Sequence, residues 1–337
     1  MRPPMTRVTL IRGDGIGPEI MEAAASLVEA TGAPIEWEEH PAGASAIAEH
    51  STPLPAETLA SIKKNKVAFK APLMTPVGGG YRSVNVLARQ ELDLYANVRP
   101  ARVFEGVKTH FDKCDLVVVR ENTQGLYAGI EHYLDPKKET AQAIALVTHY
   151  ASDRIIRFAF EYARANGRKK VTLVHKANIL KFTSGLFLRV GQEIAEEYPD
   201  IVFEDRIVDA MAMQLVMFPE RFDVIVTTNL FGDILSDLTA GLVGGLGLAP
   251  SGNYGEDTAI FEAIHGTAPD IAGRGISNPT ALTLSGAMML HHLGYHEEGK
   301  RLEAAVRGVI AEGKHLTPDL KGSATTTEFT QAVRARL

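Results

Sequence analysis

Residues 224–237 read VIVTTNLFGDILSD. The first five residues, Val224 to Thr228, are all β-branched, which is typical of a buried β-strand. A helical pattern begins at once with Asn229 and carries Asp233 and Asp237 on one face, because residues four apart share a helix face. A strand that runs directly into a helix with polar residues at the junction predicts an α/β protein, in which sites collect where strands end.

Outside this segment, the same alternation continues along the chain. Short apolar runs at residues 8–11, 67–69, 116–119 and 171–174 predict further strands, and residues 152–165 have a helical pattern. We therefore expect an α/β fold in which parallel strands dominate. No internal repeat and no low-complexity linker divides the sequence.

Length and composition limit the class of protein. The chain has 337 residues, 45% of them hydrophobic and 23% charged, which favours two domains with a large core. Its net charge of -6 has the wrong sign for general binding to a phosphate backbone, so we expect no nucleic-acid partner. An anionic substrate would need a local basic pocket.

Cysteine content and hydropathy bear on the compartment. Cys114 is the only cysteine, which fits a reducing compartment, and no apolar segment of secretory length stands at the start. The uncharged stretch 238–255 contains glycines and Pro250, which argues against a membrane-spanning helix. We therefore expect a cytoplasmic protein without membrane contact.

The two aspartates of the opening segment permit two interpretations. Asp233 and Asp237 would repel each other on one helical face, and a divalent cation bound to their oxygens would remove that repulsion. Alternatively, they are acidic residues that favour a helix N-terminus. Asp209 is a possible third carboxylate.

Three arginines lie near predicted strand or helix ends: Arg89, Arg99 and Arg120. The planar guanidinium is suited to carboxylates, so the three could hold a polycarboxylate. Surface salt bridges are the alternative. Tyr127 and Lys176 are candidate proton-transfer groups, although either could be structural, and Lys176 directly follows a predicted strand.

The glycine-rich turn at residues 13–17 follows the first strand but fails the dinucleotide-binding fingerprint. Pro18 occupies the position where that fingerprint requires its last glycine. Two readings remain, namely a tight strand-to-helix turn with an early proline, or a direct contact with a cofactor phosphate.

Taken together, several segments resemble the β-decarboxylating dehydrogenases, the family of isocitrate, isopropylmalate and homoisocitrate dehydrogenases. They are GDGIGPE at 13–19, DLYANVRP at 93–100, RENT at 120–123, NLFGDILSD at 229–237 and HGTAPDIAG at 265–273. The resemblance implies an α/β fold of this family's own type, distinct from the Rossmann fold. It further implies a large discontinuous cofactor-binding domain, residues 1–96 and 246–337, and a smaller central substrate and dimerisation domain, residues 97–245.

The resemblance also implies a role for individual residues. Substrate carboxylates would be held by Ser83, Asn85, Arg89, Arg99 and Arg120. Mg²⁺ or Mn²⁺ would be held by Asp233 and Asp237 together with Asp209 of a second subunit, and the catalytic groups would be Tyr127, Lys176 and Asp209. Contacts with NAD would come from Thr75, Asn178, His265, Gly266, Thr267, Ala268, Asp270, Ile271 and Asn278.

The activity implied by the resemblance is metal-dependent oxidative decarboxylation of isocitrate, a tricarboxylate, with reduction of NAD. Ser83 and Asn85 favour isocitrate over isopropylmalate because they offer hydrogen bonds where an apolar substituent would need apolar contacts. Asp270 favours NAD because a carboxylate repels the 2′-phosphate of NADP.

Some alternatives and one departure remain. The alternatives are homoisocitrate or isopropylmalate dehydrogenase and, in a different class, a non-catalytic regulatory subunit. The expected assembly is a homodimer or higher oligomer with active sites shared between subunits. Gln124 stands where relatives often carry Glu, which puts the role of that one side chain in doubt.

Overall fold

The computed structural model describes residues 5–75 and 83–337, and the chain forms two compact units. The first unit comprises residues 1–92, 103–110 and 243–337, and the second comprises residues 93–102 and 111–242. The unit boundaries therefore lie at 92/93 and 242/243, where the sequence analysis placed them at 96/97 and 245/246. Residues 103–110, assigned to the central domain from sequence, cluster with the first unit.

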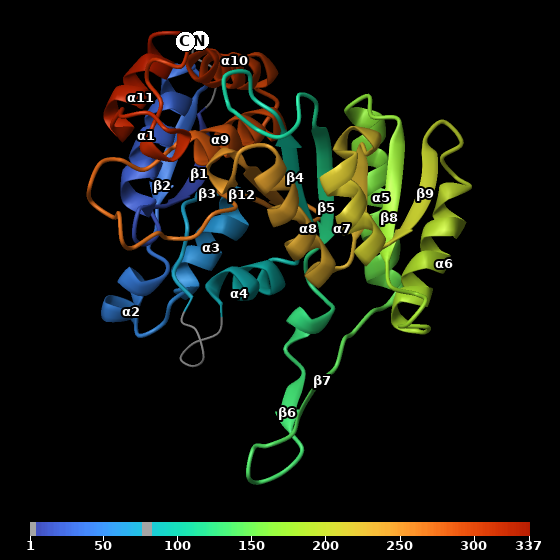
Figure 1. The fold of residues 1–337 in the computed structure, drawn as a ribbon. Helices are drawn as coiled ribbons and strands as arrows, with labels where there is room; N and C mark the ends of the chain where they lie inside the picture. The colour runs from blue at the N-terminus through green and yellow to red at the C-terminus, as the bar shows by residue number, and fades with distance from the viewer. Residues whose placement is uncertain (1–4, 76–82) are drawn as a thin grey trace. The chain divides into compact units, whose positions relative to one another are not determined.

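The first unit is a sheet with helices on it (Figure 1). Its strands run in the order β2-β1-β3-β12-β11, with β12 and β11 antiparallel and the other neighbours parallel. The elements are β1 (Thr6–Ile11), α1 (Gly17–Ala30), β2 (Ile35–Glu39), α2 (Ala44–His50), α3 (Ala56–Asn65), β3 (Val67–Lys70), α4 (Val84–Glu91), η3 (Leu246–Leu248), β11 (Pro250–Tyr254), β12 (Ala259–Ala263), α9 (Thr280–His292), α10 (His296–Glu312), η4 (Pro318–Leu320) and α11 (Thr326–Arg334).

The second unit has a second set of strands in the order β4-β5-β10-β8-β9. Here β4 and β5 are antiparallel, whereas β5, β10, β8 and β9 are parallel. The elements are β4 (Ala96–Arg102), β5 (Asp115–Glu121), η1 (Leu126–Ala128), β6 (Glu131–Tyr133), β7 (Ala141–Ala143), α5 (His149–Ala165), β8 (Lys170–His175), α6 (Thr183–Ala195), β9 (Val202–Ile207), α7 (Val208–Met217), η2 (Pro219–Arg221), β10 (Val224–Thr227) and α8 (Asn229–Leu242).

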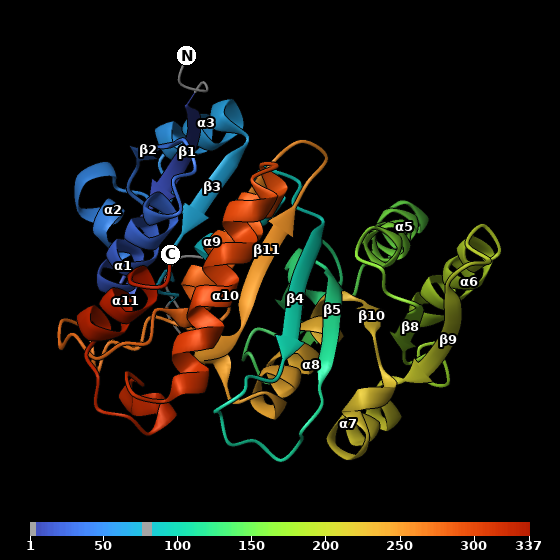
Figure 2. The ribbon, with the colours of Figure 1, turned by 90° about the horizontal axis from the view of Figure 1, so that it is seen from above.

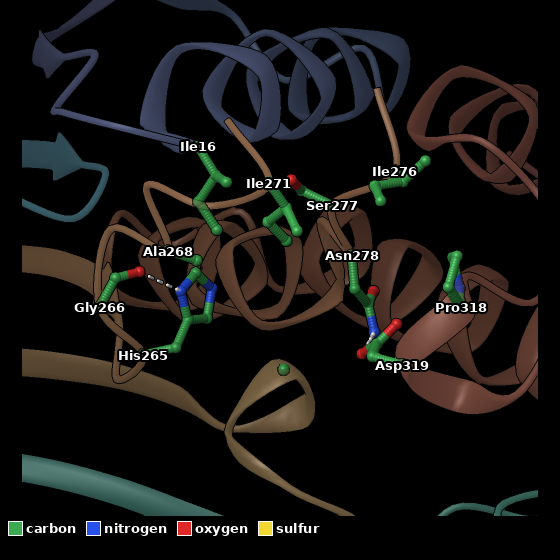
Figure 3. A pocket seen from close by; sticks show the side chains of 11 residues that line it. Ile16, His265, Gly266, Ala268, Ile271, Ile276, Ser277, Asn278, Pro318 and Asp319 are labelled. Atoms are coloured by element: carbon green, nitrogen blue, oxygen red, sulfur yellow. Dashed lines mark hydrogen bonds between the residues drawn. The ribbon is translucent and has the colours of Figure 1, made fainter. Parts of the chain in front are cut away.

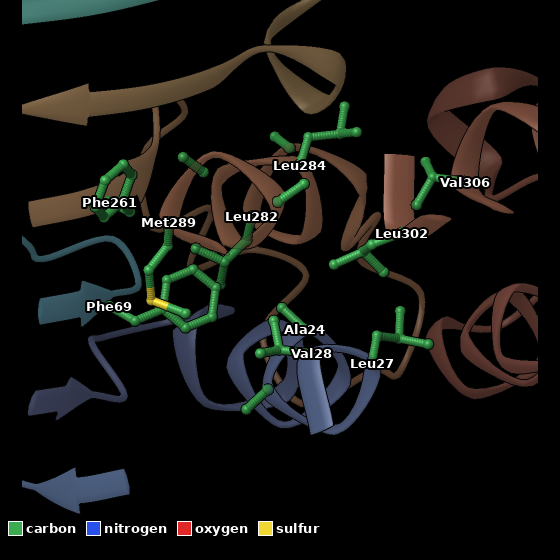
Figure 4. Packing of buried hydrophobic residues seen from close by; sticks show 14 of the residues in the cluster. Ala24, Leu27, Val28, Phe69, Phe261, Leu282, Leu284, Met289, Leu302 and Val306 are labelled. Carbon is green, nitrogen blue, oxygen red and sulfur yellow. The ribbon is translucent and has the colours of Figure 1, made fainter. Parts of the chain in front are cut away.

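The core of the first unit lies between α1, α9 and the strands. Phe69 of β3 and Phe261 of β12 lie beside Met289 and Leu282 of α9, and Val28 approaches from α1 (Figure 4). Helix α9 is buried nearly all round, since most of its residues are apolar or small. Burial at roughly 25 cal/mol per Å² of apolar surface makes this core the main stabilising feature of the unit.

In the second unit, helices lie on both sides of the strands. Figure 2 shows α5 on one side of β10 and α7 on the other. Helix α8 contacts β5 and β4 through a buried face of small residues at helical spacing, including Gly232, Ser236 and Ala240. Small residues let the helix approach the strands closely, and this places Asp233 beside the side chains of β5.

A two-stranded arm, β6 and β7, leaves the second unit (Figure 1). Its residues Tyr133 and Leu134 are exposed, as are Leu126 and Ile144 beside it.

The α/β prediction is confirmed, and parallel pairs predominate as expected. The antiparallel pairs β4–β5 and β11–β12 were not foreseen, because strand direction does not follow from the pattern of one strand. Among the described residues, no helix has the length and apolar character needed to cross a membrane.

Candidate active site

Two arginines and two aspartates form one cluster in the second unit. Arg99 of β4 and Arg120 of β5 point at α8, where Nη1 of each guanidinium meets Oδ1 of Asp233. Arg99 Nη1 also donates to Ser236 Oγ at 2.6 Å and lies 3.6 Å from Asp237 Oδ1. The structure therefore brings together four residues that the sequence analysis assigned to substrate and metal.

The two arginines are almost entirely buried, with 6% of Arg99 and 1% of Arg120 exposed. Asp233 and Asp237 face outward, since 37% and 57% of their side chains are accessible. Buried guanidinium groups need compensating acceptors, and the accessible carboxylates supply them. Burial raises the pKa of Asp237 despite the opposing charge of Arg99. The surface salt-bridge reading of these arginines is therefore wrong for Arg99 and Arg120.

Tyr127 joins this cluster from η1. Its hydroxyl donates to Asp233 Oδ2, and the Arg120 guanidinium lies 5.1 Å from the centre of its ring. Burial, together with the hydrogen bond to Asp233, raises the pKa of the phenol, and Arg120 opposes the rise. The direction of this shift favours the protonated phenol, whose hydroxyl is held next to the Asp233 carboxylate.

Lys176 and Asp209 form a second pair in the same unit. Lys176 follows β8, Asp209 lies in the first turn of α7, and Nζ donates to Asp209 Oδ1 at 2.5 Å. Lys176 lowers the pKa of Asp209. Within the described residues, no three His, Cys, Asp or Glu side chains are grouped closely enough to hold a metal ion. Asp209 therefore does not form such a group with Asp233 and Asp237 inside this chain.

The loop after β8 is braced by its neighbours. The Ala177 backbone N–H donates to His175 Nδ1 at 2.9 Å, and the Lys176 N–H donates to Ser184 Oγ at 3.2 Å. Because His175 Nδ1 accepts, its Nε2–H faces Asp205 Oδ2 at 3.0 Å. Asn178 lies on the same loop. These contacts hold the segment that presents Lys176.

In the first unit, α4 carries the other predicted substrate residues. Ser83 stands just before the helix, and its Oγ lies 3.3 Å from Thr75 Oγ1. Asn85 and Arg89 follow four residues apart. Asn85 Oδ1 and Arg89 Nε are buried and have no hydrogen-bond partner among the described residues. Such unpaired groups are costly, so they favour a polar ligand at this helix.

Arg89 belongs to a buried ion cluster that the sequence analysis did not foresee. Glu262 of β12 accepts from Arg89 Nη2 at 3.2 Å and from Asn253 Nδ2 at 2.8 Å, and Lys70 Nζ lies 2.5 Å away. Burial tends to raise the pKa of Glu262, but the charges of Lys70 and Arg89 outweigh it and lower the pKa to about 2. The cluster thus holds two cations and one anion away from water.

A cavity of about 510 Å³ lies within the first unit (Figure 3). Five of the residues predicted to contact the cofactor line it, namely His265, Gly266, Ala268, Ile271 and Asn278. The other lining residues are Ile16, Gly247, Ile276, Ser277, Pro318 and Asp319. Its size is ordinary for a small-molecule pocket, and its lining is largely apolar. Four other predicted cofactor residues, Thr75, Asn178, Thr267 and Asp270, are not among the residues that line it.

Polar groups of the cavity are oriented by short contacts. His265 Nδ1 donates to the Gly266 carbonyl at 3.0 Å, and Nε2 is buried with no partner in the part of the chain that the structure describes. Burial lowers the pKa of His265, which favours the neutral ring. Asn278 Nδ2 donates to Asp319 Oδ2 at 2.9 Å (Figure 3). A flat heterocycle with N–H donors fits such a set of apolar walls and fixed acceptors.

The glycine-rich turn is explained by packing against the loop that follows β12. Gly15 has φ +59°, and a Cβ there would lie 2.1 Å from the Thr267 carbonyl oxygen. Gly13 has φ +76°, and its Cβ would lie 2.4 Å from the Pro72 carbonyl. Only glycine fits these positions, so the structural reading of the turn accounts for its glycines. Of the residues in this turn, Ile16 lines the cavity.

Several of these residues carried little signal in the sequence. Ser236 was quoted beside the aspartates without a role, although its spacing of three from Asp233 places it on the same helix face. Glu262 precedes the His265 motif and could have been noticed as a charge inside an apolar strand. Pro318 and Asp319 had no signal, because they reach the cavity only through the fold.

These features define an α/β protein with a buried arginine cluster facing two aspartates in one unit and a small-molecule-sized cavity in the other. The family described as isocitrate/isopropylmalate dehydrogenase matches residues 7–333. The chain belongs to this family.

Similar proteins extend over nearly the whole chain. The structure of isocitrate dehydrogenase from Methylococcus capsulatus is 60% identical, with a TM-score of 0.96, and the match covers 98% of this chain and 99% of that one. Catalytic subunit 5 of mitochondrial NAD isocitrate dehydrogenase from Arabidopsis thaliana is 50% identical over 96% of this chain and 87% of its own length. A protein named as a regulatory subunit of the mitochondrial NAD enzyme, from Dictyostelium discoideum, is also 50% identical, over 96% of this chain and 90% of its own length.

These comparisons correct one expectation. The cytoplasmic assignment is wrong, because the relatives from Arabidopsis and Dictyostelium are named as mitochondrial proteins. A single buried cysteine fits a reducing environment, and it does not distinguish one reducing compartment from another.

Proposed function

We propose that this protein is a catalytically active NAD-dependent isocitrate dehydrogenase, which oxidises isocitrate and releases CO₂ to give 2-oxoglutarate. The observation that carries the proposal is the cluster of buried Arg99 and Arg120 with Tyr127, Asp233 and Asp237. Its cationic base suits substrate carboxylates, and its acidic face and phenol supply groups for the chemistry. The names of the similar proteins support the same activity.

Substrate selectivity would depend on α4. Ser83 and Asn85 offer hydrogen bonds to the third carboxylate of isocitrate, and Arg89 offers a charge. Asn85 Oδ1 and Arg89 Nε are buried and have no partner within residues 5–75 and 83–337, which supports a polar ligand there. An apolar substituent in place of the carboxylate would leave these groups unpaired, at a cost of about 1–3 kcal/mol each.

The proton transfers would involve Lys176 with Asp209, and Tyr127. The Lys176–Asp209 pair would accept the proton of the substrate hydroxyl, and its lysine lies on the braced loop after β8. Tyr127, with its raised pKa, keeps a proton to deliver to carbon after CO₂ has left. We infer that the Lys176 pair serves a neighbouring subunit, so that a homodimer would share its active sites.

The donor set fits a divalent cation. Asp233 and Asp237 offer accessible carboxylate oxygens one helical turn apart, the ligand type that Mg²⁺ and Mn²⁺ prefer. Because this chain groups no third acid with them among its described residues, Asp209 of a second subunit would complete the set. When bound, the cation supplies Lewis-acid stabilisation of negative charge on oxygen.

NAD would place its adenosine in the cavity of the first unit. The buried His265 Nε2 is a fixed acceptor without a partner, and Ile16 and Ile271 supply apolar walls. Asp270 is exposed beside the cavity loop, where its charge would disfavour the phosphate of NADP.

A regulatory role is the competing function, since the Dictyostelium relative named as regulatory is as similar as the catalytic one from Arabidopsis. The retention here of Tyr127, Lys176, Asp209, Asp233 and Asp237 supports catalysis, because each has a chemical role.

The deciding experiment is an absorbance assay of the purified protein at the reduced-nicotinamide band. Isocitrate, homoisocitrate and isopropylmalate are each combined with NAD and with NADP, with Mg²⁺ or Mn²⁺ and after exhaustive chelation. We expect turnover with isocitrate, NAD and metal, and none after chelation. No turnover in any combination would favour the regulatory role, and faster turnover of another acid would reassign the substrate.

A further inference from the structure

Asn229, the first residue of α8, is buried and makes three hydrogen bonds through its side chain. Its Oδ1 accepts from Arg120 Nε at 3.0 Å and from Arg120 Nη2 at 2.8 Å. Its Nδ2 donates to the carbonyl oxygen of Gln124 at 3.1 Å. A buried amide that uses both ends in this way has a single orientation.

The contact with Asn229 determines how Arg120 presents its charge. Asn229 engages the Nε and Nη2 edge of the guanidinium, and Nη1 is directed at Asp233. Gly232, on the next turn of the same helix, gives room for the stem of Arg120, because a Cβ there would lie 2.6 Å from Arg120 Cγ. One helix thus sets both the path of the side chain and the rotation of its planar end.

The contact with Gln124 extends the network to the loop before Tyr127. Gln124 Oε1 accepts from the Thr148 N–H and from Thr148 Oγ1, each at 3.1 Å. Glu121 accepts from the Gln124 N–H at 2.9 Å. The side chain of Gln124, where relatives often carry Glu, therefore acts here as a hydrogen-bond acceptor through Oε1. Glutamine and glutamate can both fill this role.

We propose that Asn229 is a positioning residue that orients Arg120 toward the substrate carboxylate and holds the loop that carries Tyr127. Nothing in the sequence motifs assigned it a role. The proposal rests on the proposed function for its kinetic consequence only, since the orientation of Arg120 can be measured without turnover.

The test compares Asn229→Ala and Asn229→Asp in the full-length protein. The matched control is Thr239→Val, a buried residue of α8 whose hydroxyl bonds only within the helix in the described structure. Asn229→Ala removes the acceptor of Arg120, whereas Asn229→Asp keeps an acceptor of the same shape and loses the donor to Gln124.

Two readouts separate positioning from general stability. The first is hydrogen exchange of the Arg120 Nε–H, followed by ¹⁵N NMR and assigned by its loss in Arg120→Lys. We expect exchange at least tenfold faster in Asn229→Ala, and within threefold of the wild type in Asn229→Asp and Thr239→Val. The second is kinetic: Asn229→Ala should raise KM for isocitrate at least tenfold, with kcat/KM down about 100-fold, and leave the Kd for NAD within twofold.

Unchanged Nε–H exchange in Asn229→Ala, or exchange in Asn229→Asp that is as fast as in Asn229→Ala, would overturn the proposal. An equal loss of kcat/KM in Thr239→Val would also overturn it, because stability alone would then explain the effect. If the wild type does not turn over isocitrate, the proposed function fails, and the exchange measurement still decides the role of Asn229.

Discussion

Replacing Glu262 with glutamine tests the energetics of the buried ion cluster in the first unit. Glu262→Gln keeps the shape and one acceptor oxygen but removes the only anion facing Lys70 and Arg89 in the described contacts. The pKa of Glu262 falls from 4.5 to about 2 on folding. Since one pKa unit corresponds to about 1.4 kcal/mol, the charged form contributes about 3 kcal/mol to stability at neutral pH.

The sign of the pH dependence follows from the direction of the shift. A carboxyl with a lowered pKa stabilises the folded state above its unfolded pKa, and the contribution is lost as pH falls toward the folded pKa. The stability difference between wild type and Glu262→Gln should therefore be full at pH 7. It should be about 1 kcal/mol smaller at pH 4, where the unfolded carboxyl is already partly protonated.

Urea unfolding, followed by circular dichroism at pH 7 and pH 4, measures this difference. The control is Glu36→Gln, whose salt bridge with Arg7 is 3.1 Å long and about half exposed, and it should cost less than about 1 kcal/mol. If Glu262→Gln costs no more than the control at pH 7, or if the difference grows at pH 4, the reasoning is wrong.

Three further changes test the turn, the cofactor and the assembly. At Gly15 (φ +59°) a new Cβ would lie 2.1 Å from a carbonyl oxygen, whereas at Gly32 (φ +82°) it would meet open space. Urea unfolding should therefore show that Gly15→Ala lowers stability more than Gly32→Ala, by roughly 2 kcal/mol. Equal costs would refute the packing argument. Replacing Asp270-Ile271 with Lys-Tyr should raise kcat/KM for NADP and lower it for NAD, and a wild-type preference for NADP would contradict the role of the carboxylate. Mixing inactive Lys176→Ala and Tyr127→Phe proteins under subunit exchange should restore activity, whereas no recovery despite demonstrated exchange would count against shared sites.

Local sequence was sufficient wherever a site depends on spacing within one element. The β-branched run at 224–228 and the helix after it follow from side-chain period and propensity, and they place Asp233 and Asp237 on one face. The loop from His265 to Ile271 could likewise be identified as one cofactor-binding segment, because the residues that the family resemblance assigns to NAD are adjacent or nearly adjacent in the sequence. Four of its seven residues, His265, Gly266, Ala268 and Ile271, line the cavity.

Tertiary structure alone decided which of these segments meet. Asn229 contacts Arg120 across 109 residues of chain, and Glu262 contacts Arg89 across 173. Asp319 reaches the cavity from near the C-terminus. Periodicity reports which face of an element is buried, but it carries no information about the partner that buries it. Whether a buried charge is paired depends on residues that are distant in the sequence. The network around Arg120 and the low pKa of Glu262 therefore arise only when the chain has folded.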